Sequence, residues 1–196
     1  KEKRTSLINH VVTKGLDPNV EMKDSGVEWI GEIPVSWSKT KITRYCEVKD
    51  GTHDTPKYID VSEDSIPLVT SNSFVNGNID FSKSKRIRFQ DYLEINKRSD
   101  VKLNDVIMSM IGSNIGNRVL VQTENPFSIK NVCLFKTSES KNLISKYLIY
   151  LIDSRFLKYQ VDFNQKGGGQ PFLSLDELRN LLFPFPLLLE QQQIVE

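Results

Sequence analysis

The residues whose types best suit acid–base chemistry are His53 and Asp54, which follow Gly51 and Thr52. An imidazole beside a carboxylate is a frequent pairing in general acid–base catalysis. Neighbouring residues in an extended segment point to opposite faces, however, so these two side chains are not expected to converge on a substrate. We therefore interpret this segment as a polar loop and not as a catalytic pair.

Two further segments have part of the composition of a catalytic or cofactor loop. Asn125-Pro126-Phe127 is similar to the Asn/Asp-Pro-Pro-Tyr/Phe loop with which amino-methyltransferases hold a flipped base, but it lacks one proline and no glycine-rich cofactor turn precedes it. A turn between strands is the better interpretation. The run Gly167 to Gly169 lacks the Gly-Lys-Ser/Thr ending of a phosphate-binding loop, so a nucleotide site is not expected.

No other motif in the sequence has the spacing of an active site. A metal-binding His/Glu helix, a Gly-x-Ser-x-Gly elbow and a nuclease-like cluster of carboxylates with lysine are all missing from the sequence. Cys46 and Cys133 lie far apart, with no Cys or His near them at ligand spacing, which indicates buried thiols in a reducing cytoplasm. We therefore predict a chain that is not an enzyme and that binds no metal and no cofactor.

Composition is that of an ordinary globular protein. The 196 residues are 38% hydrophobic and 26% charged, which is enough for one core. The sequence has no apolar run of about 18 residues and no signal-peptide pattern, so no membrane contact is expected.

Net charge is only +1, so any nucleic-acid surface must be a local patch. One segment, from Lys83 to Arg98, has six basic and two acidic residues. It is either a patch for phosphates or a solvated strand face, and the residue count leaves both interpretations open. The basic residues are Lys83, Lys85, Arg86, Arg88, Lys97 and Arg98.

The N-terminal region predicts a helix followed by an extended arm. Apolar residues recur at helical spacing within residues 1–14, and Gly15 is a stop signal. Residues 16–36 show little periodicity but include Trp29, Ile30 and Ile33, which, with Trp37, an arm of this kind must bury.

The middle of the chain, from residue 37 to 188, predicts an α+β domain with a twisted, mostly antiparallel sheet and flanking helices. We expect a short helix from Ile42 to Gly51 and a long amphipathic helix from Leu143 to Tyr159. Asn76-Gly77 and the segment 112–116 are turn signals. Strands are expected at residues 67–71, 86–89, 106–111, 118–121 and 132–136.

The C-terminal region combines a glycine run, a capped helix, an edge strand and a new helix. Lys166 and Gln170 flank the glycines and provide a cation and an amide suited to phosphates or base edges. Ser174 and Glu177 have the spacing of a capping box, which places a helix start at Leu175. Pro184 and Pro186 restrict their segment to an edge strand, and a helix is expected from residue 189 to 196.

This C-terminal order, together with Lys-Asp-Ser-Gly, Trp-Ile-Gly-Glu-Ile-Pro and Trp between Lys23 and Trp37, resembles a target-recognition domain from the specificity subunits of type I restriction-modification systems. The position of the arm resembles the junction before the second such domain. The resemblance implies that residues 1–15 end a central conserved helix, that residues 16–36 are a linker and that residues 189–196 begin a distal conserved helix. A chain that starts and stops within helices is expected to be a segment of a longer protein or half of a duplicated one.

The resemblance also implies which residues face DNA. The family has a Gly-Thr-His segment followed by Pro and Tyr at the start of the domain, which matches Gly51 to Tyr58, and a second similar stretch begins at Asn104 and includes a serine-containing turn. With the basic run and the glycine segment, the predicted DNA contacts are Thr52, His53, Lys57, Tyr58, Ser71, Asn72, Lys83, Lys85, Arg86, Arg88, Ser113, Asn114, Lys166 and Gln170.

The function implied is recognition of one half of a bipartite sequence in double-stranded DNA, in a prokaryotic cytoplasm. Modification subunits would dock on the spacer helices and methylate adenine with S-adenosylmethionine, and restriction subunits would use ATP and magnesium, so those cofactors belong to partners. Two alternatives stay open: a recognition domain fused to a methyltransferase-nuclease polypeptide, and a protein-interaction module without DNA binding.

Overall fold

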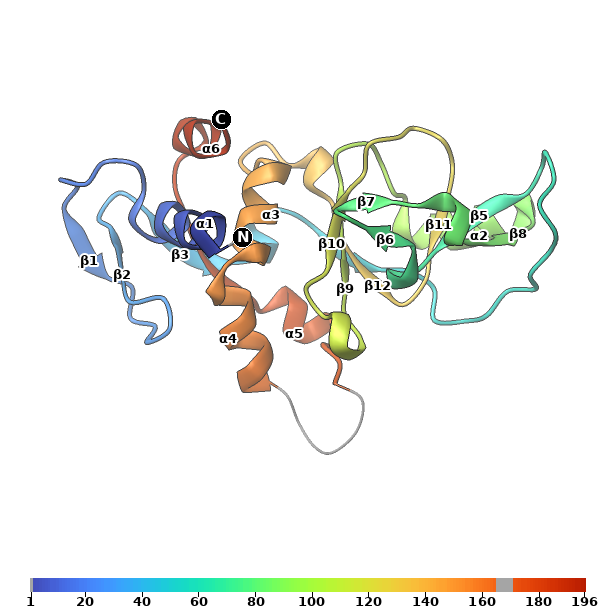
Figure 1. Ribbon diagram of the computed structural model, residues 1–196, viewed down its shortest axis with the longest axis horizontal. Coiled ribbons are helices and arrows are strands. Elements are labelled where there is room, and N and C mark those ends of the chain that lie inside the picture. The colour runs from blue at the N-terminus through green and yellow to red at the C-terminus, as the bar shows by residue number, and fades with distance from the viewer. Residues whose placement is uncertain (1, 165–170) are drawn as a thin grey trace.

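The computed structural model describes residues 2–164 and 171–196, and it shows an elongated α+β molecule. Helices α1, α3, α4, α5 and α6 gather in one part of the molecule, with the β1–β2 pair beyond them, and short strands with α2 form the other part (Figure 1). A sheet lies between the two parts. We call these parts the helical half, built from α1, α3 to α6, β1 to β3 and β13, and the distal lobe, residues 51–104 and 121–131.

The sheet between the two parts is antiparallel, with the strand order β10-β9-β12-β4. Alternate side chains of each strand point to opposite faces of this sheet, and each face packs against a different apolar cluster. In β9, Val106 and Met108 join the core of the helical half, whereas Ile107 joins a cluster in the distal lobe. The strands are β4 (Val48–Asp50), β9 (Val106–Ser109), β10 (Arg118–Leu120) and β12 (Val132–Phe135).

The helical half packs its helices around one apolar cluster that includes Trp37, Tyr147 and Phe183. Strand β13 pairs with β3 and contributes Phe183 and Phe185 to this cluster, and β1 pairs with β2 in the arm. The helices are α1 (Glu2–Lys14), α3 (Ser145–Asp153), α4 (Arg155–Asn164), α5 (Leu175–Arg179) and α6 (Leu188–Val195). The strands are β1 (Met22–Asp24), β2 (Glu32–Pro34), β3 (Ser38–Lys41) and β13 (Leu182–Phe185).

The distal lobe has a three-stranded sheet, order β11-β5-β8, with helix α2 packed on it through Tyr92 and Ile95. The pair β11 and β5 is parallel, and β6 and β7 form a hairpin. The elements are β5 (Ile66–Val69), β6 (Phe74–Val75), β7 (Asn78–Ile79), β8 (Lys85–Ile87), α2 (Phe89–Ser99) and β11 (Ser128–Ile129). Single 3-10 turns are η1 (Ile42–Arg44), η2 (Ser71–Ser73), η3 (Phe81–Lys83), η4 (Gly112–Asn114) and η5 (Thr137–Glu139).

A buried ion pair connects the loops that flank the central sheet. Lys136 Nζ lies 2.8 Å from Asp105 Oδ2, and both side chains are almost fully inaccessible to solvent. The Asp105 carboxylate also accepts hydrogen bonds from the backbone N–H of Lys102 at 2.9 Å and of Ser138 at 3.0 Å. These bonds offset the cost of removing both charges from water.

Several predicted elements are confirmed. Helix α1 ends before Gly15, whose φ is +74°, and Ser174 with Glu177 forms a complete capping box at the start of α5. Ile30, Ile33 and Trp37 are buried, as predicted, whereas Trp29, for which burial was also predicted, is only partly buried against the same core. Both cysteines are buried free thiols, and burial raises the pKa of Cys46 from its ordinary 9.0 to about 12. The α+β class with predominantly antiparallel pairing is also confirmed, although the strands divide into five sheets.

The predicted helix from Ile42 to Gly51 is wrong. Residues 42–44 form only a 3-10 turn, and the chain then extends as β4, where its backbone pairs with β12. Apolar residues close together suggested a helical stripe, but the unpaired edge of β12 selected the extended form. Tertiary pairing overrides weak local preference in segments this short.

The predicted helix from Leu143 to Tyr159 is two helices, α3 and α4, separated at Ser154. The Ser154 hydroxyl donates to the Leu151 carbonyl at 2.5 Å and accepts from the Phe156 N–H at 3.3 Å. A serine side chain that bonds to the backbone in this way competes with the helical hydrogen bonds. The apolar periodicity continues across the break, which is why it did not reveal the break.

Helix α2 was not predicted, because the sequence pattern indicated only a strand at residues 86–89 and no element between residues 90 and 105. Strand β8 ends at Ile87, and the chain then turns into a helix that presents Tyr92 and Ile95 to the sheet. The helix ends at Asp100, which adopts a left-handed conformation with φ +47°.

Candidate nucleic-acid interface

Gly51 leaves β4 at a point where there is no room for a side chain. A Cβ at this position would lie 2.3 Å from the Ile129 carbonyl oxygen and 2.9 Å from the Lys130 nitrogen, both of which are backbone atoms. The close approach lets the next residue, Thr52, donate its N–H to Ile129 at 3.0 Å and accept from the Asn131 N–H at 3.1 Å. Only glycine, which lacks a Cβ, lets the two backbone segments come this close at residue 51.

His53 then turns back toward the body of the protein. Its Nε2 lies 2.8 Å from Asp50 Oδ2, and its Nδ1 lies 3.1 Å from the Asn131 side-chain oxygen. The Asp50 carboxylate is buried and is also bound by Arg98, through Nε at 2.9 Å and Nη2 at 2.5 Å. The histidine therefore pairs with Asp50 and not with Asp54, in agreement with the prediction that His53 and Asp54 do not converge.

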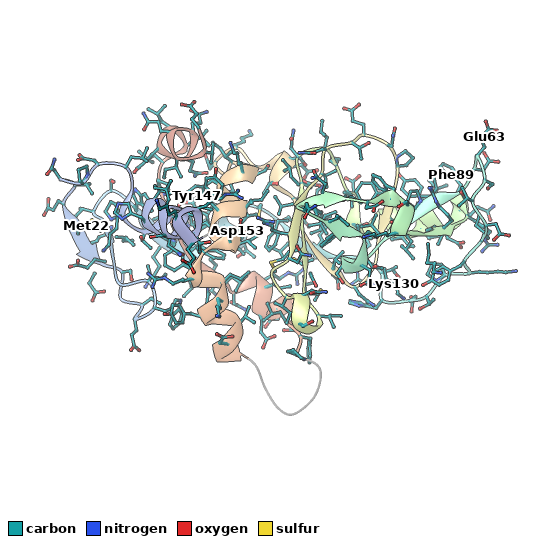
Figure 2. The ribbon with its side chains drawn as sticks, viewed as in Figure 1. Met22, Glu63, Phe89, Lys130, Tyr147 and Asp153 are labelled. Carbon is teal, nitrogen blue, oxygen red and sulfur yellow. The ribbon has the colours of Figure 1, made fainter. Side chains whose placement is uncertain are left out.

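Lys130 lies beneath residues 53–55 and binds all three of them through its ammonium group. This lysine is only 8% exposed, and its ammonium donates to the carbonyls of His53 and Asp54, at 3.2 and 2.8 Å, and to Thr55 Oγ1 at 2.6 Å. Figure 2 shows Lys130 at the lower side of the distal lobe, away from the helical half.

Residues 52–58, hereafter the 52–58 loop, end beside the basic strand β8. The Ile59 N–H donates to the Arg86 carbonyl at 2.9 Å, and the two residues form an antiparallel bridge. Lys57 and Tyr58, at the end of the loop, are both exposed. Two segments that were predicted separately, the Gly-Thr-His segment and the basic run, are thus neighbours.

The 3-10 turns η2 and η3 bring Ser71 and Asn72 close to Lys83. The Asp80 N–H donates to the Ser73 carbonyl at 2.8 Å, and the hydroxyls of Ser73 and Ser84 lie 3.0 Å apart. Asn72 is exposed and Ser71 half-buried, so polar groups of η2 are accessible beside those of η3.

The basic residues of the run differ in how far they are already neutralised. Arg88 makes a two-bond contact with Asp91, at 2.9 and 3.0 Å, which lowers the pKa of Asp91 and raises that of Arg88. Arg98 is bonded to Asp50, as described above. Lys85 is exposed and forms no ion pair with any residue the structure describes. The interpretation of the run as one strand face is therefore wrong, because its cations are spread over η3, β8 and α2.

Ser113 and Asn114 lie apart from these residues, on η4 at the far end of the central sheet. The Gly112 N–H donates to the Pro171 carbonyl at 2.7 Å, which places η4 beside the start of the second described range. Ser113 also lines a cavity of about 590 Å³ together with Lys158 and Pro171. Lys166 and Gln170 lie outside the described residues.

The sequence did not reveal Asp50, Lys130 and Asn131, which position the 52–58 loop. It identified Arg98 only as a member of the basic run and not as the partner of Asp50. The available signal was Lys130-Asn131, a polar pair between the apolar residues Phe127 and Val132. A lysine inside an apolar run is almost never buried without partners. Asn131 has a second role, since its φ of +55° is tolerated by asparagine better than by most residues.

Within residues 2–164 and 171–196, no three His, Cys, Asp or Glu side chains lie close enough together to hold a metal ion. No helix of that part of the chain is long and apolar enough to cross a membrane.

A family model described as "Type I restriction modification DNA specificity domain" matches residues 34–196. The chain therefore belongs to this family of DNA specificity domains. The match extends over most of the chain and includes the C-terminal segment, and the resemblance to a target-recognition domain of a specificity subunit is confirmed.

Two curated relatives are specificity subunits of type I restriction enzymes. The MjaVIII specificity subunit of Methanocaldococcus jannaschii is 23% identical over 98% of this chain and 45% of the relative. The EcoBI specificity subunit of Escherichia coli is 24% identical over 83% of this chain and 34% of the relative. The chain thus spans less than half the length of either relative. Specificity subunits are the non-catalytic components of such systems, which agrees with the prediction that the chain is not an enzyme.

The fold is also that of solved specificity subunits. The HsdS subunit from Thermoanaerobacter tengcongensis superposes with a TM-score of 0.64 at 14% identity, over 99% of this chain and 41% of that one. The S subunit of a type I restriction-modification system from M. genitalium has a TM-score of 0.50 at 16% identity, over 87% of this chain and 36% of that one. Identities this low with a shared fold mean that the target-reading residues must be argued from this chain's own geometry.

Proposed function

We propose that the chain reads one half of a bipartite target in double-stranded DNA, and that the distal lobe is the part that meets the duplex. The observation that carries this proposal is the backbone bond between Ile59 and Arg86, which brings the 52–58 loop beside strand β8. Polar loop residues and unpaired cations at one place are the combination that DNA recognition requires.

Each group of residues has a role that its chemistry suits. Lysine and arginine side chains contact phosphates and fix the register of the protein on DNA, whereas hydroxyl and amide side chains read base edges. The proposed phosphate contacts are Lys57, Lys83, Lys85, Arg86 and Arg88. The proposed base contacts are Thr52, Tyr58, Ser71 and Asn72. Ser113 and Asn114 are proposed as a second group of polar contacts on η4. Lys166 and Gln170, outside the described residues, stay proposed from the sequence as a phosphate contact and a base contact.

The rest of the system is assigned to partner subunits. Modification subunits dock on the spacer helices, of which α1 and α6 are the adjoining ends, and methylate adenine with S-adenosylmethionine. Restriction subunits use ATP and magnesium to translocate and cleave in the prokaryotic cytoplasm.

The first test is selection from a pool of duplexes with a randomised centre, followed by sequencing of the bound fraction. Enrichment of one short half-site is expected. Affinity for the enriched duplex should fall linearly on a plot of log affinity against log salt, because bound phosphates release counterions. Absence of both enrichment and salt dependence would favour the protein-interaction module.

The second test separates a specificity subunit from a recognition domain fused to an enzyme. Methylated adenines are mapped in the source genome with and without the gene for this chain. A specificity subunit requires that the selected half-site occur within a methylated bipartite sequence, and that a separate polypeptide carry the methyltransferase motif. A methyltransferase motif upstream in the same polypeptide would establish the fused form.

A further inference from the structure

We propose that Asp50, His53 and Lys130 form a preset support for the 52–58 loop, and that His53 positions this loop and does not read a base. The inference rests on the proposed function, since it assigns roles within the surface that meets DNA. It changes the role of one residue that the family resemblance placed at DNA, and it adds Asp50 and Lys130, which that resemblance did not include.

Both hydrogen-bonding groups of the His53 ring already have partners within the protein. Asp50 and Asn131 occupy the two ring nitrogens, at 2.8 and 3.1 Å. An imidazole has no other polar atom, so only its carbon edge and its face remain available to a ligand. Base reading through Nε2 would require breaking the bond to the buried Asp50 carboxylate, which is costly because that carboxylate would lose a partner. Base reading through Nδ1 would require displacing the Asn131 side chain, which also fixes the position of the ring.

Lys130 likewise has no hydrogen-bonding group left for DNA, and unlike His53 it is also buried. A lysine ammonium has three N–H donors, and three acceptors on His53, Asp54 and Thr55 lie within hydrogen-bond distance of Nζ. The side chain is also only 8% exposed. This cation therefore has neither a free donor nor the access to bind a phosphate, although a basic residue in a DNA-binding domain suggests that role.

The physical consequence is that the loop is ordered before DNA arrives. A loop whose carbonyls are already fixed loses less conformational entropy on binding, which increases affinity without adding a contact. Loss of the support should weaken binding while leaving the number of bound phosphates unchanged. The salt slope reports that number, at about 0.9 per phosphate for duplex DNA, so affinity and slope separate a support from a contact.

The test compares Lys130→Met with Lys57→Met, two substitutions of the same type at a buried and an exposed lysine. The duplex enriched from the randomised pool, labelled with fluorescein, is titrated by anisotropy over a series of salt concentrations. Lys130→Met should weaken binding by about tenfold, equivalent to about 1.4 kcal/mol, with the parent's slope. Lys57→Met should lower the slope by about one. A Lys130→Met variant that loses one unit of slope, or that binds as the parent does, would overturn the proposal.

The role of His53 is tested with His53→Phe, which keeps a ring and removes both nitrogens. Repeating the pool selection should give weaker binding with the parent's base preference at every position. Loss of preference at one position alone would show that His53 reads a base, and the proposal would be wrong for this residue.

Hydrogen exchange in the absence of DNA keeps the support testable even if the proposed function fails. The Thr52 amide donates to the Ile129 carbonyl, and the Asn131 amide donates to the Thr52 carbonyl. Both amides should exchange faster in Lys130→Met than in the parent. The amides of α3 are the control and should exchange at the parent's rate. Unchanged exchange at both loop amides would refute the support. Faster exchange in a chain that binds no DNA would refute only the proposed function.

Discussion

In the helical half, aromatic and aliphatic side chains from helices, from the arm and from β13 pack into one large apolar cluster, whereas the distal lobe has two small clusters. The lobe relies more on polar bonds at its surface, of which the contacts of Asp50 and Lys130 are the clearest. Apolar burial is insensitive to the identity of surface residues, but polar bonds organise individual loops. The helical half therefore provides most of the stability, whereas the distal lobe arranges exposed polar groups.

The largest expected effect comes from removing an aromatic side chain from the helical half. Phe183 is fully buried beside Phe185, so Phe183→Ala should lower the free energy of unfolding by about 3–5 kcal/mol. The matched variant in the distal lobe is Phe89→Ala. Phe89 is 50% exposed and lies on the upper side of the lobe (Figure 2), so the loss there should be below about 1 kcal/mol. Urea denaturation of both variants measures the difference, and equal losses would contradict the comparison.

The next effect tests the junction between the two parts. Lys136→Met leaves the buried Asp105 carboxylate without its cation and should cost about 3 kcal/mol of unfolding free energy. The control is Lys97→Met, which removes an exposed lysine paired with Glu94 and should cost about 0.5 kcal/mol or less. Thermal unfolding of the two variants is the measurement, and a similar loss in both would show that burial of the pair has no consequence.

An intermediate effect is expected at the start of the 52–58 loop. Gly51→Ala places a Cβ against backbone atoms of Ile129, so the loop must shift, with an expected loss of about 1–3 kcal/mol and weaker DNA binding. Gly31→Ala is the control in the helical half, because it meets no atom within 4 Å and has only the strain of φ +68°. It should reduce stability slightly and leave the affinity for DNA unchanged. Equal affinities in the two variants would mean that the loop does not contact DNA.

The smallest expected effect distinguishes cations of the distal lobe that are free to bind phosphate from cations that already have an acidic partner. Lys85→Ala should lower the salt slope of DNA binding by about one, because this exposed lysine has no ion pair with the described residues. Arg88→Ala should change the slope less, since its guanidinium is already bound by Asp91. Anisotropy titrations at several salt concentrations measure both slopes. A larger change for Arg88 would show that DNA displaces Asp91.

Local patterns in the sequence predicted the ends of the molecule well. Gly15 stops α1, Ser174 and Glu177 cap α5, and Pro184 lies in an edge strand, each for a reason contained within a few residues. The middle was less predictable. Residues 42–51 extend because β12 offers them a partner strand, and β4 lies far from β12 along the chain.

The candidate site shows the same division. The Gly-Thr-His segment and the basic run were found in the sequence, but their adjacency depends on the bridge between Ile59 and Arg86, which no local pattern encodes. The residues that hold the loop, Asp50 and Lys130, are separated by 80 positions in the sequence and were missed.

The sequence by itself determined the family, the α+β class, the capped and proline-limited C-terminal elements and the absence of catalytic motifs, because each depends on residue types at fixed short spacings. Only the tertiary structure decided that Arg98 binds Asp50 and that Arg88 binds Asp91. It alone also decided that Lys130 is buried and bonded to the 52–58 loop. The reason is physical: the chemistry of a charged side chain is set by its burial and its partners. Those partners come from strands and helices that meet only after the chain has folded.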